Sequence, residues 1–578
     1  MNREEITKEI IELEREIAIL PAGGIARKKI NDKDYYYHRI NRDGKRKEIY
    51  IPFEEVEELR SQIDRRKSLE KRLKEYSRVL LSNTKHEVAI KSGENKPRFH
   101  TMVRTGKQLE SQLQIIRKYK KRACISELRE YIFGDISDKV FVIYGLRRTG
   151  KTTMVRQILT ELPDAEFNKA AFIQITSKDT LADLDEDIRL LEEQGYKYLF
   201  IDEVTLLEDF IEGAAVFADI YASSGMKIVL SGTDSLGFAI SKEEQLYDRC
   251  IMLHTTFIPY REFEEVLGIE GIDEYIRFGG TMSLSGVNYN ENATFASAKS
   301  AEEYIDTAIA KNIQHSLKMY EYGGHFRGLL DLYEHGELTN VINRVIENIN
   351  HSFTKDVVER TFKSHDISVT AANKMLDVIN KEEQSIDIDD VHMIQIREYL
   401  SLLDLIIDVD LEYLPQTGKS SKMTVITQPG MRYAQAGAIV ENLLLDVKFN
   451  SLSVQERKLV LDRLLDEIRG RMMEEIVLLE TKLSNPDKKV FKLQFAVGEI
   501  DMVVFDPQEL NCEIYEIKHS REQVSDQYCH LVDESKCRQV IHRYGDIKGK
   551  YVIYRGNDMK IDTVQYLNVE SYLKELTI

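Results

Sequence analysis

The spacing of apolar and polar residues changes several times along the chain, and each change predicts a different kind of structure. Apolar residues at helical spacing predict a helix over 2–19. Short alternating segments with turn residues predict strands over 25–51, and a long charged helix is predicted over 53–82. Residues 1–85 are therefore expected to form an accessory module of helix, hairpin and helix.

Beyond a polar linker at 86–100, a helix is predicted over 106–134. From 140 to 260, apolar strands alternate with helices, which is typical of a parallel α/β sheet. The chain is then mostly helical to residue 400. A helix and a strand pair around Gly418 follow over 401–430, and the remaining residues mix helix and strand again.

These shifts predict a multidomain α/β protein. After the N-terminal module, we expect a parallel-sheet core over 86–285, a helical region over 286–432 and a mixed α/β domain over 433–578. A length of 578 residues fits three to five domains at roughly 100–200 residues each.

Composition narrows the class of protein. The net charge of −18 means that binding to nucleic acid would have to come from local basic patches, such as the interleaved basic and tyrosine residues of 27–48. A small solvated hairpin is the favoured interpretation of that segment. The chain has no apolar run long enough for a membrane span, and its five cysteines form no CxxC pair. We therefore expect a cytoplasmic protein without membrane association.

A phosphate-binding loop follows the apolar strand at 140–144. The loop matches the pattern GxxxxGK[ST], in which glycines let the backbone wrap around phosphates and the next helix presents free N–H groups. Lys151 is expected to reach the β- and γ-phosphates of ATP, and Thr152 to hold Mg²⁺. The expected nucleotide-binding residues are Gly145, Leu146, Arg147, Arg148, Thr149, Gly150, Lys151, Thr152, Thr153 and, from a later strand, Thr233.

Two further strands supply the other parts of an ATPase. The strand at 198–201 ends in Asp202 and Glu203, which suit the Mg²⁺ shell and the activation of the attacking water. The strand beginning at Lys227 ends in Ser231 and Thr233. We expect Thr233 to face the γ-phosphate, with Ser231 close behind; a plain turn is the alternative.

Over 140–280 the chain resembles the prokaryotic AAA-type ATPases often called archaeal-type ATPases. The resemblance rests on the double-arginine P-loop, the FIDEV and LSGT strands, Leu246-Tyr-Asp-Arg249, Tyr260-Arg-Glu-Phe263 and Phe278-Gly-Gly280. The usual glycine before the arginine is Asp248 here. By this resemblance Arg249 would stabilise the transferring phosphoryl group; a surface salt bridge is its alternative role.

A second candidate site lies near the C-terminus. Asp501 and Glu516 are expected on adjacent strands, and alternation places Glu516 and Lys518 on one strand face. Paired carboxylates can hold Mg²⁺, and Lys518 could orient or deprotonate a water, which together would suit hydrolysis of a phosphodiester. The alternative is a structural Lys–Glu pair without catalysis.

This region resembles the restriction-endonuclease-like PD-(D/E)xK fold. The resemblance adds an acid from a preceding helix, here Glu474, and expects a helix over 521–543 and a strand over 550–554. Residues 391–432 resemble the winged-helix region that archaeal-type ATPases often carry before a nuclease-like domain.

Together these features predict an ATP-hydrolysing switch coupled to a metal-dependent nuclease that acts on DNA or RNA. By family analogy, its setting would be defence or toxin-like growth control. The alternative is a non-cleaving regulatory ATPase in which the nuclease-like domain is a binding scaffold. Self-assembly into a homo-oligomer is left open.

Overall fold

The computed structural model describes residues 99–281, with short gaps between 208 and 247, together with 390–414 and 421–577. Parts of 16–72 and of 295–349 are also described. Most of the predicted helix over 2–19, most of the linker over 86–100 and much of the helical region before 390 lie outside the described residues. The chain divides into two compact units, Met1–Arg98 and Phe99–Ile578.

The N-terminal unit contains a three-stranded antiparallel sheet of β1 (Gly24–Ile30), β2 (Lys33–Arg42) and β3 (Lys45–Ile51), with β2 in the centre. These strands confirm the alternation predicted over 25–51. Helical residues follow; Val56 and Ile63, seven residues apart, are buried on one helix face, and Leu69 is also buried.

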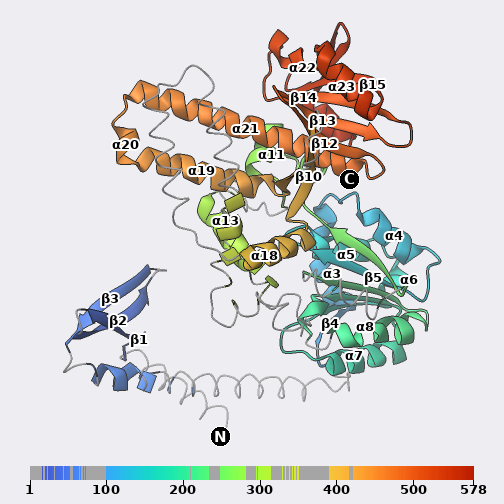
Figure 1. Ribbon diagram of the computed structural model, residues 1–578. Helices are drawn as coiled ribbons and strands as arrows, with labels where there is room; N and C mark the ends of the chain where they lie inside the picture. The colour runs from blue at the N-terminus through green and yellow to red at the C-terminus, as the bar shows by residue number, and fades with distance from the viewer. Residues whose placement is uncertain are drawn as a thin grey trace. The chain divides into compact units, whose positions relative to one another are not determined.

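The second unit opens with a six-stranded sheet, called here the P-loop sheet (Figure 1). Its order is β4-β6-β7-β8-β5-β9, and every pairing is parallel except that of the edge strand β4 with β6. The parallel α/β sheet predicted over 140–260 is therefore confirmed. The strands are β4 (Met102–Thr105), β5 (Val140–Gly145), β6 (Ala170–Gln174), β7 (Tyr198–Asp202), β8 (Lys227–Gly232) and β9 (Cys250–Thr255).

Helices cover both faces of this sheet, and each face packs into its own apolar cluster. The helices are α3 (Gly106–Leu113), α4 (Ile125–Phe133), α5 (Lys151–Leu159), α6 (Asp164–Phe167), α7 (Leu181–Glu193) and α8 (Phe210–Val216). Short 3₁₀ turns η2 (Ile116–Lys118) and η3 (Val204–Leu206) and a π-helical turn η4 (Phe217–Ala222) complete them.

The single helix predicted over 106–134 is wrong, because the chain breaks between η2 and α4. The break contains a basic segment, Lys118–Arg122, of which one residue is buried. Arg122 is buried, and its Nε donates to Glu262 Oε2 at 2.6 Å. A buried guanidinium must keep its partner, so this ion pair fixes the break.

The C-terminal sheet has eight strands in the order β11-β10-β12-β13-β14-β15-β17-β16. The strands are β10 (Ile406–Leu414), β11 (Ser421–Ile426), β12 (Lys489–Phe495), β13 (Glu499–Asp506), β14 (Asn511–Lys518), β15 (Asp546–Tyr554), β16 (Met559–Ile561) and β17 (Val564–Asn568). Strands β12, β13 and β14 form an antiparallel meander, and β15 returns parallel to β14.

The helices around this sheet include α18 (Asp390–Leu402), α19 (Pro429–Leu445), α20 (Val447–Asn450), α21 (Val454–Ser484), α22 (Cys529–Val532), α23 (Glu534–Tyr544) and α24 (Val569–Glu575). The segments between the two sheets are α10 (Tyr260–Leu267), α11 (Ile272–Phe278), α13 (Ala298–Tyr304) and the π-helical η5 (Ile305–Ala310). A 3₁₀ turn, η6 (Ser525–Tyr528), precedes α22, so the helix expected over 521–543 begins only at Cys529 and is divided at Asp533 into α22 and α23.

Strand β10 pairs in parallel with β12, with Asp410 opposite Phe491. The strand pair expected around Gly418 is present as β10 and β11, but it extends the C-terminal sheet. The boundary predicted between residues 432 and 433 would cut this sheet in two. Sequence alternation alone could not reveal the pairing, because strand partners so far apart in sequence leave no local signal.

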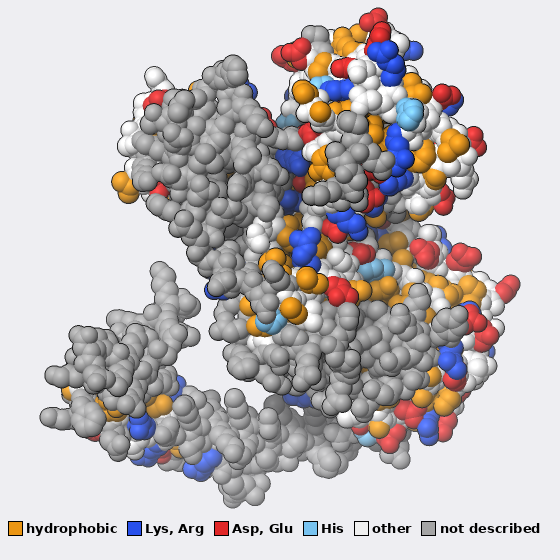
Figure 2. Space-filling view, viewed as in Figure 1, with side chains coloured by type: hydrophobic (Ala, Val, Ile, Leu, Met, Phe, Trp, Pro, Cys, Tyr) orange, Lys and Arg blue, Asp and Glu red, His pale blue; other side chains and the backbone are white. Residues whose placement is uncertain are grey.

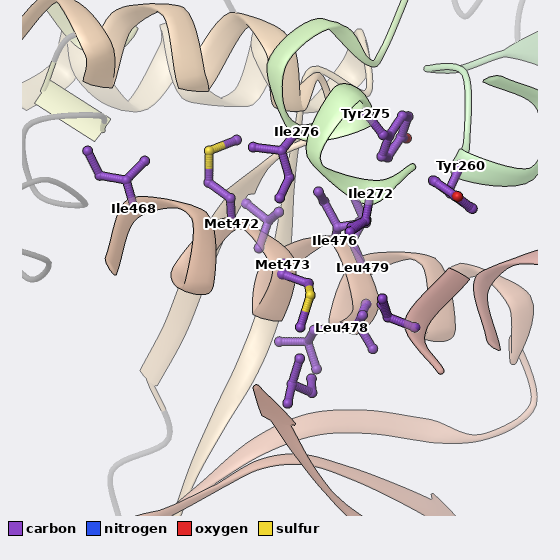
Figure 3. Close-up of a cluster of buried hydrophobic side chains, with 14 of the residues drawn as sticks. Tyr260, Ile272, Tyr275, Ile276, Ile468, Met472, Met473, Ile476, Leu478 and Leu479 are labelled. Atoms are coloured by element: carbon purple, nitrogen blue, oxygen red, sulfur yellow. The ribbon is translucent and has the colours of Figure 1, made fainter. Parts of the chain in front are cut away.

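Helix α21 packs between the C-terminal sheet and the helices α10 and α11 that follow the P-loop sheet, in one apolar cluster (Figure 3). Tyr260, Tyr275 and Ile276 from α10 and α11 lie in the same cluster as Met472 and Met473 of α21. The opposite side of the cluster reaches the C-terminal sheet through residues such as Met502, Val504 and Ile517.

Of the helices in the described part of the chain, none has both the length and the apolar character of a membrane span.

A carboxyl group is buried inside this junction. Glu480 of α21 is 1% exposed, and its Oε1 accepts a hydrogen bond from the backbone N–H of Tyr260 at 2.8 Å and from the hydroxyl of Tyr275 at 3.1 Å. Burial raises the pKa of Glu480 to about 8, against which these two hydrogen bonds act in the lowering direction. The nearby carboxylate of Glu262 also raises it.

We expect Glu480→Gln to flatten the dependence of stability on pH. The folded wild type keeps the Glu480 proton up to about pH 8, whereas the unfolded chain releases it near the ordinary value of 4.5. The unfolding free energy of the wild type therefore falls as pH rises between these values. Gln has no proton to lose, so its melting temperature should gain on that of the wild type across this window.

Thermal melts of both proteins at intervals across the window measure this effect. Glu534→Gln, at an exposed position on α23, is the matched control and should follow the wild type. Parallel curves for wild type and Glu480→Gln would show that the buried carboxyl is ionised throughout.

Candidate functional sites

The P-loop follows β5, which lies between β8 and β9 in the P-loop sheet. Gly145 has φ 132°, and a Cβ there would lie 2.2 Å from the backbone oxygen of Thr255. Gly150 has φ 91° and is the last residue of the loop, directly before α5. Both glycines are required by the backbone, so the loop conformation is encoded locally.

Lys151 lies within its own loop. Its Nζ donates to the backbone oxygens of Gly145 and Leu146 at 2.8 and 2.7 Å, and burial lowers its pKa to about 8. The Thr149 hydroxyl donates to the Leu146 oxygen at 2.8 Å and so braces the same turn. An ammonium held only by carbonyl groups remains available to a phosphate.

The predicted Mg²⁺ pair is in contact. The Thr152 hydroxyl donates to Asp202 Oδ2 at 2.9 Å, and the Ser231 hydroxyl donates to Asp202 Oδ1. Parallel strands β7 and β8 bring these groups to one sheet edge, because Asp202 is in register with Ser231. Hydroxyl and carboxylate oxygens are the donors that Mg²⁺ prefers, so this pair fits a nucleotide-bound ion.

Glu203 stands next to this pair with φ 58°, a left-handed backbone conformation. Burial raises the pKa of its carboxyl, and the charge of Asp202 adds to the rise. The Thr233 hydroxyl donates to Glu203 Oε2 at 3.2 Å. Thr233 thus contacts the residue expected to activate water, while Ser231 contacts the residue expected to hold Mg²⁺.

Arg249 lies elsewhere. It precedes β9, and its backbone oxygen accepts from Val140 at the start of β5, whereas the P-loop follows the end of β5. The six residues of β5 separate its two ends by about 20 Å. Its Nε donates to Asp219 Oδ1 at 2.6 Å, so within one chain the surface salt bridge describes Arg249. A role at a phosphate remains a prediction that requires a second copy.

Sequence reasoning missed the residues that brace the P-loop from outside. Arg122 donates to the Thr149 backbone oxygen at 2.8 Å while paired with Glu262. On the opposite side, the Tyr304 hydroxyl donates to the Arg147 backbone oxygen at 3.1 Å and accepts from Gln428 Nε2 at 3.0 Å. These partners are far apart in sequence, and no local sequence motif predicts their contacts.

The second predicted site forms a compact cluster. Lys518 Nζ lies 2.8 Å from Asp501 Oδ2 and 2.7 Å from Glu516 Oε2. The backbone N–H of Ile517 also donates to Asp501 Oδ2 at 2.8 Å. The structure thus brings together the three side chains that strand alternation placed on neighbouring strands.

Charge and burial divide the roles of the two acids. The ammonium groups of Lys518 and Lys492, together with the hydrogen bonds to Asp501, lower the pKa of its carboxyl against the effect of burial. Burial raises the pKa of Glu516, and the charge of Asp501 raises it further. These surroundings favour the negative charge on Asp501 over that on Glu516.

Lys492 on β12 was not predicted. It is buried, and its Nζ lies 3.0 Å from Glu499, 3.4 Å from Glu474 and 3.8 Å from Asp501. The predicted acid Glu474 thus joins the cluster through this lysine. On α21 the contacts continue from Glu474 to Arg471 at 3.1 Å, and Glu475 pairs with Arg432 of α19 at 2.8 Å.

The donor set can be tested against the implied Mg²⁺. Within the described ranges, no three or more His, Cys, Asp or Glu side chains converge as a group that could hold a metal. Two carboxylates are present, and Glu516 Oε1 is buried without a hydrogen-bond partner. Since Mg²⁺ often takes only one or two carboxylates and keeps several waters, Asp501 and Glu516 fit such an ion.

Comparison with known families agrees with the first site. Residues 137–264 match a family described as an AAA domain, AAA_14, and residues 3–61 match a domain of unknown function, DUF6788. Residues 137–264 contain the P-loop, Asp202, Glu203 and Thr233 described above. This part of the chain is an AAA-type P-loop ATPase domain. No curated protein matches the chain.

Among solved structures, the chain is similar to the Aeropyrum pernix Orc1 protein in complex with DNA, with 11% identity and a TM-score of 0.21 over 58% of this chain and 93% of that one. It is also similar to Cdc6p from Pyrobaculum aerophilum, with 13% identity and a TM-score of 0.22 over 59% and 97%. Likenesses at these TM-scores carry no conclusion about fold or function.

We expect Lys151→Ala to lower ATP turnover by about two orders of magnitude or more, because the phosphates lose their buried cation. Glu203→Gln should retain nucleotide binding but lose turnover, since the Mg²⁺ ligands remain while water activation is removed. Nucleotide binding and phosphate release measured on the same preparations separate the two effects.

Lys169→Ala, an exposed lysine before β6, is the control and should match the wild type. Wild-type turnover in Glu203→Gln would contradict the role given to Glu203.

Proposed function

We propose that the chain is an ATP-hydrolysing switch coupled to a metal-dependent nuclease that acts on DNA or RNA. The observation that carries the nuclease part is the buried cluster of Asp501, Glu516 and Lys518 on adjacent strands β13 and β14. These three residue types at this spacing are the parts required for phosphodiester hydrolysis.

The surrounding topology supports this proposal. Helix α21, the meander β12–β14, the helices α22 and α23 and the parallel strand β15 follow one another in the order expected for a restriction-endonuclease-like domain. Glu474 occupies the helix that would supply the additional acid, and it contacts Lys492 next to Asp501. The acidic net charge does not exclude nucleic acid, because both basic and acidic side chains occupy the visible face of the C-terminal part (Figure 2).

In the ATPase step, Lys151 would neutralise the β- and γ-phosphates, and Thr152 with Asp202 would hold Mg²⁺. Glu203 would orient the attacking water, with Thr233 holding its carboxylate in place. The raised pKa of Glu203 suits a group that accepts a proton during turnover.

In the nuclease step, Asp501 and Glu516 would hold Mg²⁺, which supplies a Lewis acid and a more acidic bound water. Lys518 would stabilise the negative charge that develops on the phosphate oxygens as water adds and the sugar oxygen leaves. Lys492 would keep Asp501 ionised and in position through its 3.8 Å contact.

We expect Glu516→Ala and Lys518→Ala to abolish cleavage of labelled DNA or RNA in the presence of Mg²⁺ or Mn²⁺ while leaving ATP hydrolysis at the wild-type rate. The two candidate sites use separate residues, so the loss of nucleic-acid cleavage should not affect ATP hydrolysis. Exposed residues of the same domain provide matched controls, Glu534→Ala and Lys548→Ala, which should cleave normally.

A wild-type protein that hydrolyses ATP but cleaves no DNA or RNA tested, with or without ATP, would contradict the nuclease proposal. If that protein still bound metal at Asp501, the non-cleaving regulatory ATPase would replace it.

Metal binding has its own measurement. Added Mg²⁺ or Mn²⁺ should raise the melting temperature of the wild type more than that of Asp501→Ala, because a ligand that binds only the folded state stabilises it. Both proteins should be measured without nucleotide, so that the P-loop site contributes little. Equal shifts in the two proteins would place the metal elsewhere.

A further inference from the structure

A buried cation without a carboxylate partner lies on α23. Lys536 is 8% exposed, and its Nζ contacts the Nδ1 of His530 at 2.6 Å and lies 5.3 Å from the centre of the Phe495 ring. In the described part of the chain, no Asp or Glu forms an ion pair with it. The nearby Asp533 instead caps α23, accepting from the backbone N–H groups of Ser535 and Lys536.

Such a charge is costly to bury. An ammonium group removed from water is normally compensated by a carboxylate and by hydrogen bonds to acceptor groups. Lys492, the other buried lysine of this domain among the described residues, has three carboxylates within reach, and the less buried Lys518 has two. The buried ammonium of Lys536 has no carboxylate within ion-pair distance among the described residues.

His530 turns this cation into a two-donor site. A lysine ammonium can only donate, so His530 Nδ1 accepts, and the neutral imidazole carries its proton on Nε2. Burial lowers the pKa of His530, and the charges of Lys536 and Lys518 lower it further, which favours the neutral ring at pH 7. The Nε2–H is therefore a second donor beside the Lys536 ammonium.

Both donors converge on the turn between β12 and β13. Gly498 has φ 82°, and a Cβ placed there would lie 2.8 Å from His530 Nε2 and 2.8 Å from Lys536 Nζ. The turn leads directly into Glu499 and Asp501 on β13. Helix α22, which carries His530, packs against both β13 and β14, the two strands of the candidate nuclease cluster.

We propose that Lys536 and His530 bind a backbone phosphate of a nucleic-acid chain beside the cluster of Asp501, Glu516 and Lys518. The assignment rests on the proposed nuclease function and names two residues that position its substrate. A phosphate supplies acceptor oxygens and the missing negative charge together, and it suits one cationic and one neutral donor. A neighbouring phosphate held here would fix the register of the strand relative to the cluster.

The test measures binding of the full-length protein to a fluorescent oligonucleotide, single-stranded or duplex, in EDTA so that no cleavage occurs. We expect Lys536→Gln to weaken binding by about tenfold and to reduce the slope of log affinity against log salt by about one. Lys548→Gln, an exposed lysine of the same domain, should bind as the wild type does. Lys536→Arg should restore part of the loss.

Stability separates a ligand-binding role from a structural one. If Lys536 serves the ligand, Lys536→Met should melt at or above the wild-type temperature, because it removes an unpaired buried charge. A structural role predicts a lower melting temperature together with the loss of binding, and that result would overturn the proposal. ATP hydrolysis should be unchanged in every variant.

Free phosphate is tested in parallel. If inorganic phosphate raises the melting temperature of the wild type but not of Lys536→Gln, while oligonucleotide affinity is equal in both, the pair binds a free anion and the proposal is overturned. Unchanged oligonucleotide affinity in Lys536→Gln overturns it as well. In that case, abolished cleavage in Glu516→Ala would still support the nuclease, so the two failures are distinguishable.

Discussion

The burial of α21 is the constraint on which the rest of the second unit depends. One side of this helix packs against α11 and α19, and the other against β12 and β14, so its C-terminal half is buried nearly all round. The three acids of that C-terminal half have different neighbours: Glu474 contacts Lys492 of the sheet, Glu475 pairs with Arg432, and Glu480 accepts hydrogen bonds from the tyrosines of α10 and α11. Because a helix rises about 1.5 Å per residue, Glu475 and Glu480 are held roughly 7.5 Å apart along one rigid element. The contact of α21 with α10 and α11 is thus fixed relative to the candidate nuclease cluster.

This arrangement gives the proposed coupling a physical route. The P-loop backbone at Arg147 contacts Tyr304, which contacts Gln428 at the start of α19, and one turn further along that helix Arg432 pairs with Glu475. Each contact is between buried or partly buried groups, so a displacement at one end cannot be absorbed by solvent. Coupling through these contacts would also need an element with two discrete arrangements, whose equilibrium both sites influence. Tyr304 supplies the contact with the P-loop. A comparison of the nucleotide-free and ATP-bound protein would identify the element that changes its arrangement.

How much the sequence revealed depended on how local the information was. The P-loop was predictable because its chemistry and its backbone requirements lie within eight consecutive residues. The cluster of Asp501, Glu516 and Lys518 was predictable because alternation fixes strand faces and a short meander brings them together. Lys492, the ion pair of Arg122 with Glu262 and the parallel pairing of β10 with β12 were not, since each joins segments whose proximity is set only by the tertiary fold. The same reason explains Arg249: its motif predicted a role at a phosphate, but the strand direction puts it at the other edge of the sheet.

The buried lysines show how charge compensation distinguishes structure from ligand binding. Lys492 and Lys518 each touch carboxylates, so the folded protein itself balances their charges. Lys151 does not; its ammonium is held by two backbone carbonyls, and the loop around it is built to receive a phosphate. Lys536 has the second kind of surroundings, an imidazole nitrogen and an aromatic face, within the domain that carries the nuclease-like cluster. A fold that leaves a buried ammonium without an acid gives up stability, and natural proteins accept that loss chiefly where a ligand restores it. The physical argument that predicts phosphate binding at Lys151 therefore predicts an anion from outside the chain at Lys536 as well.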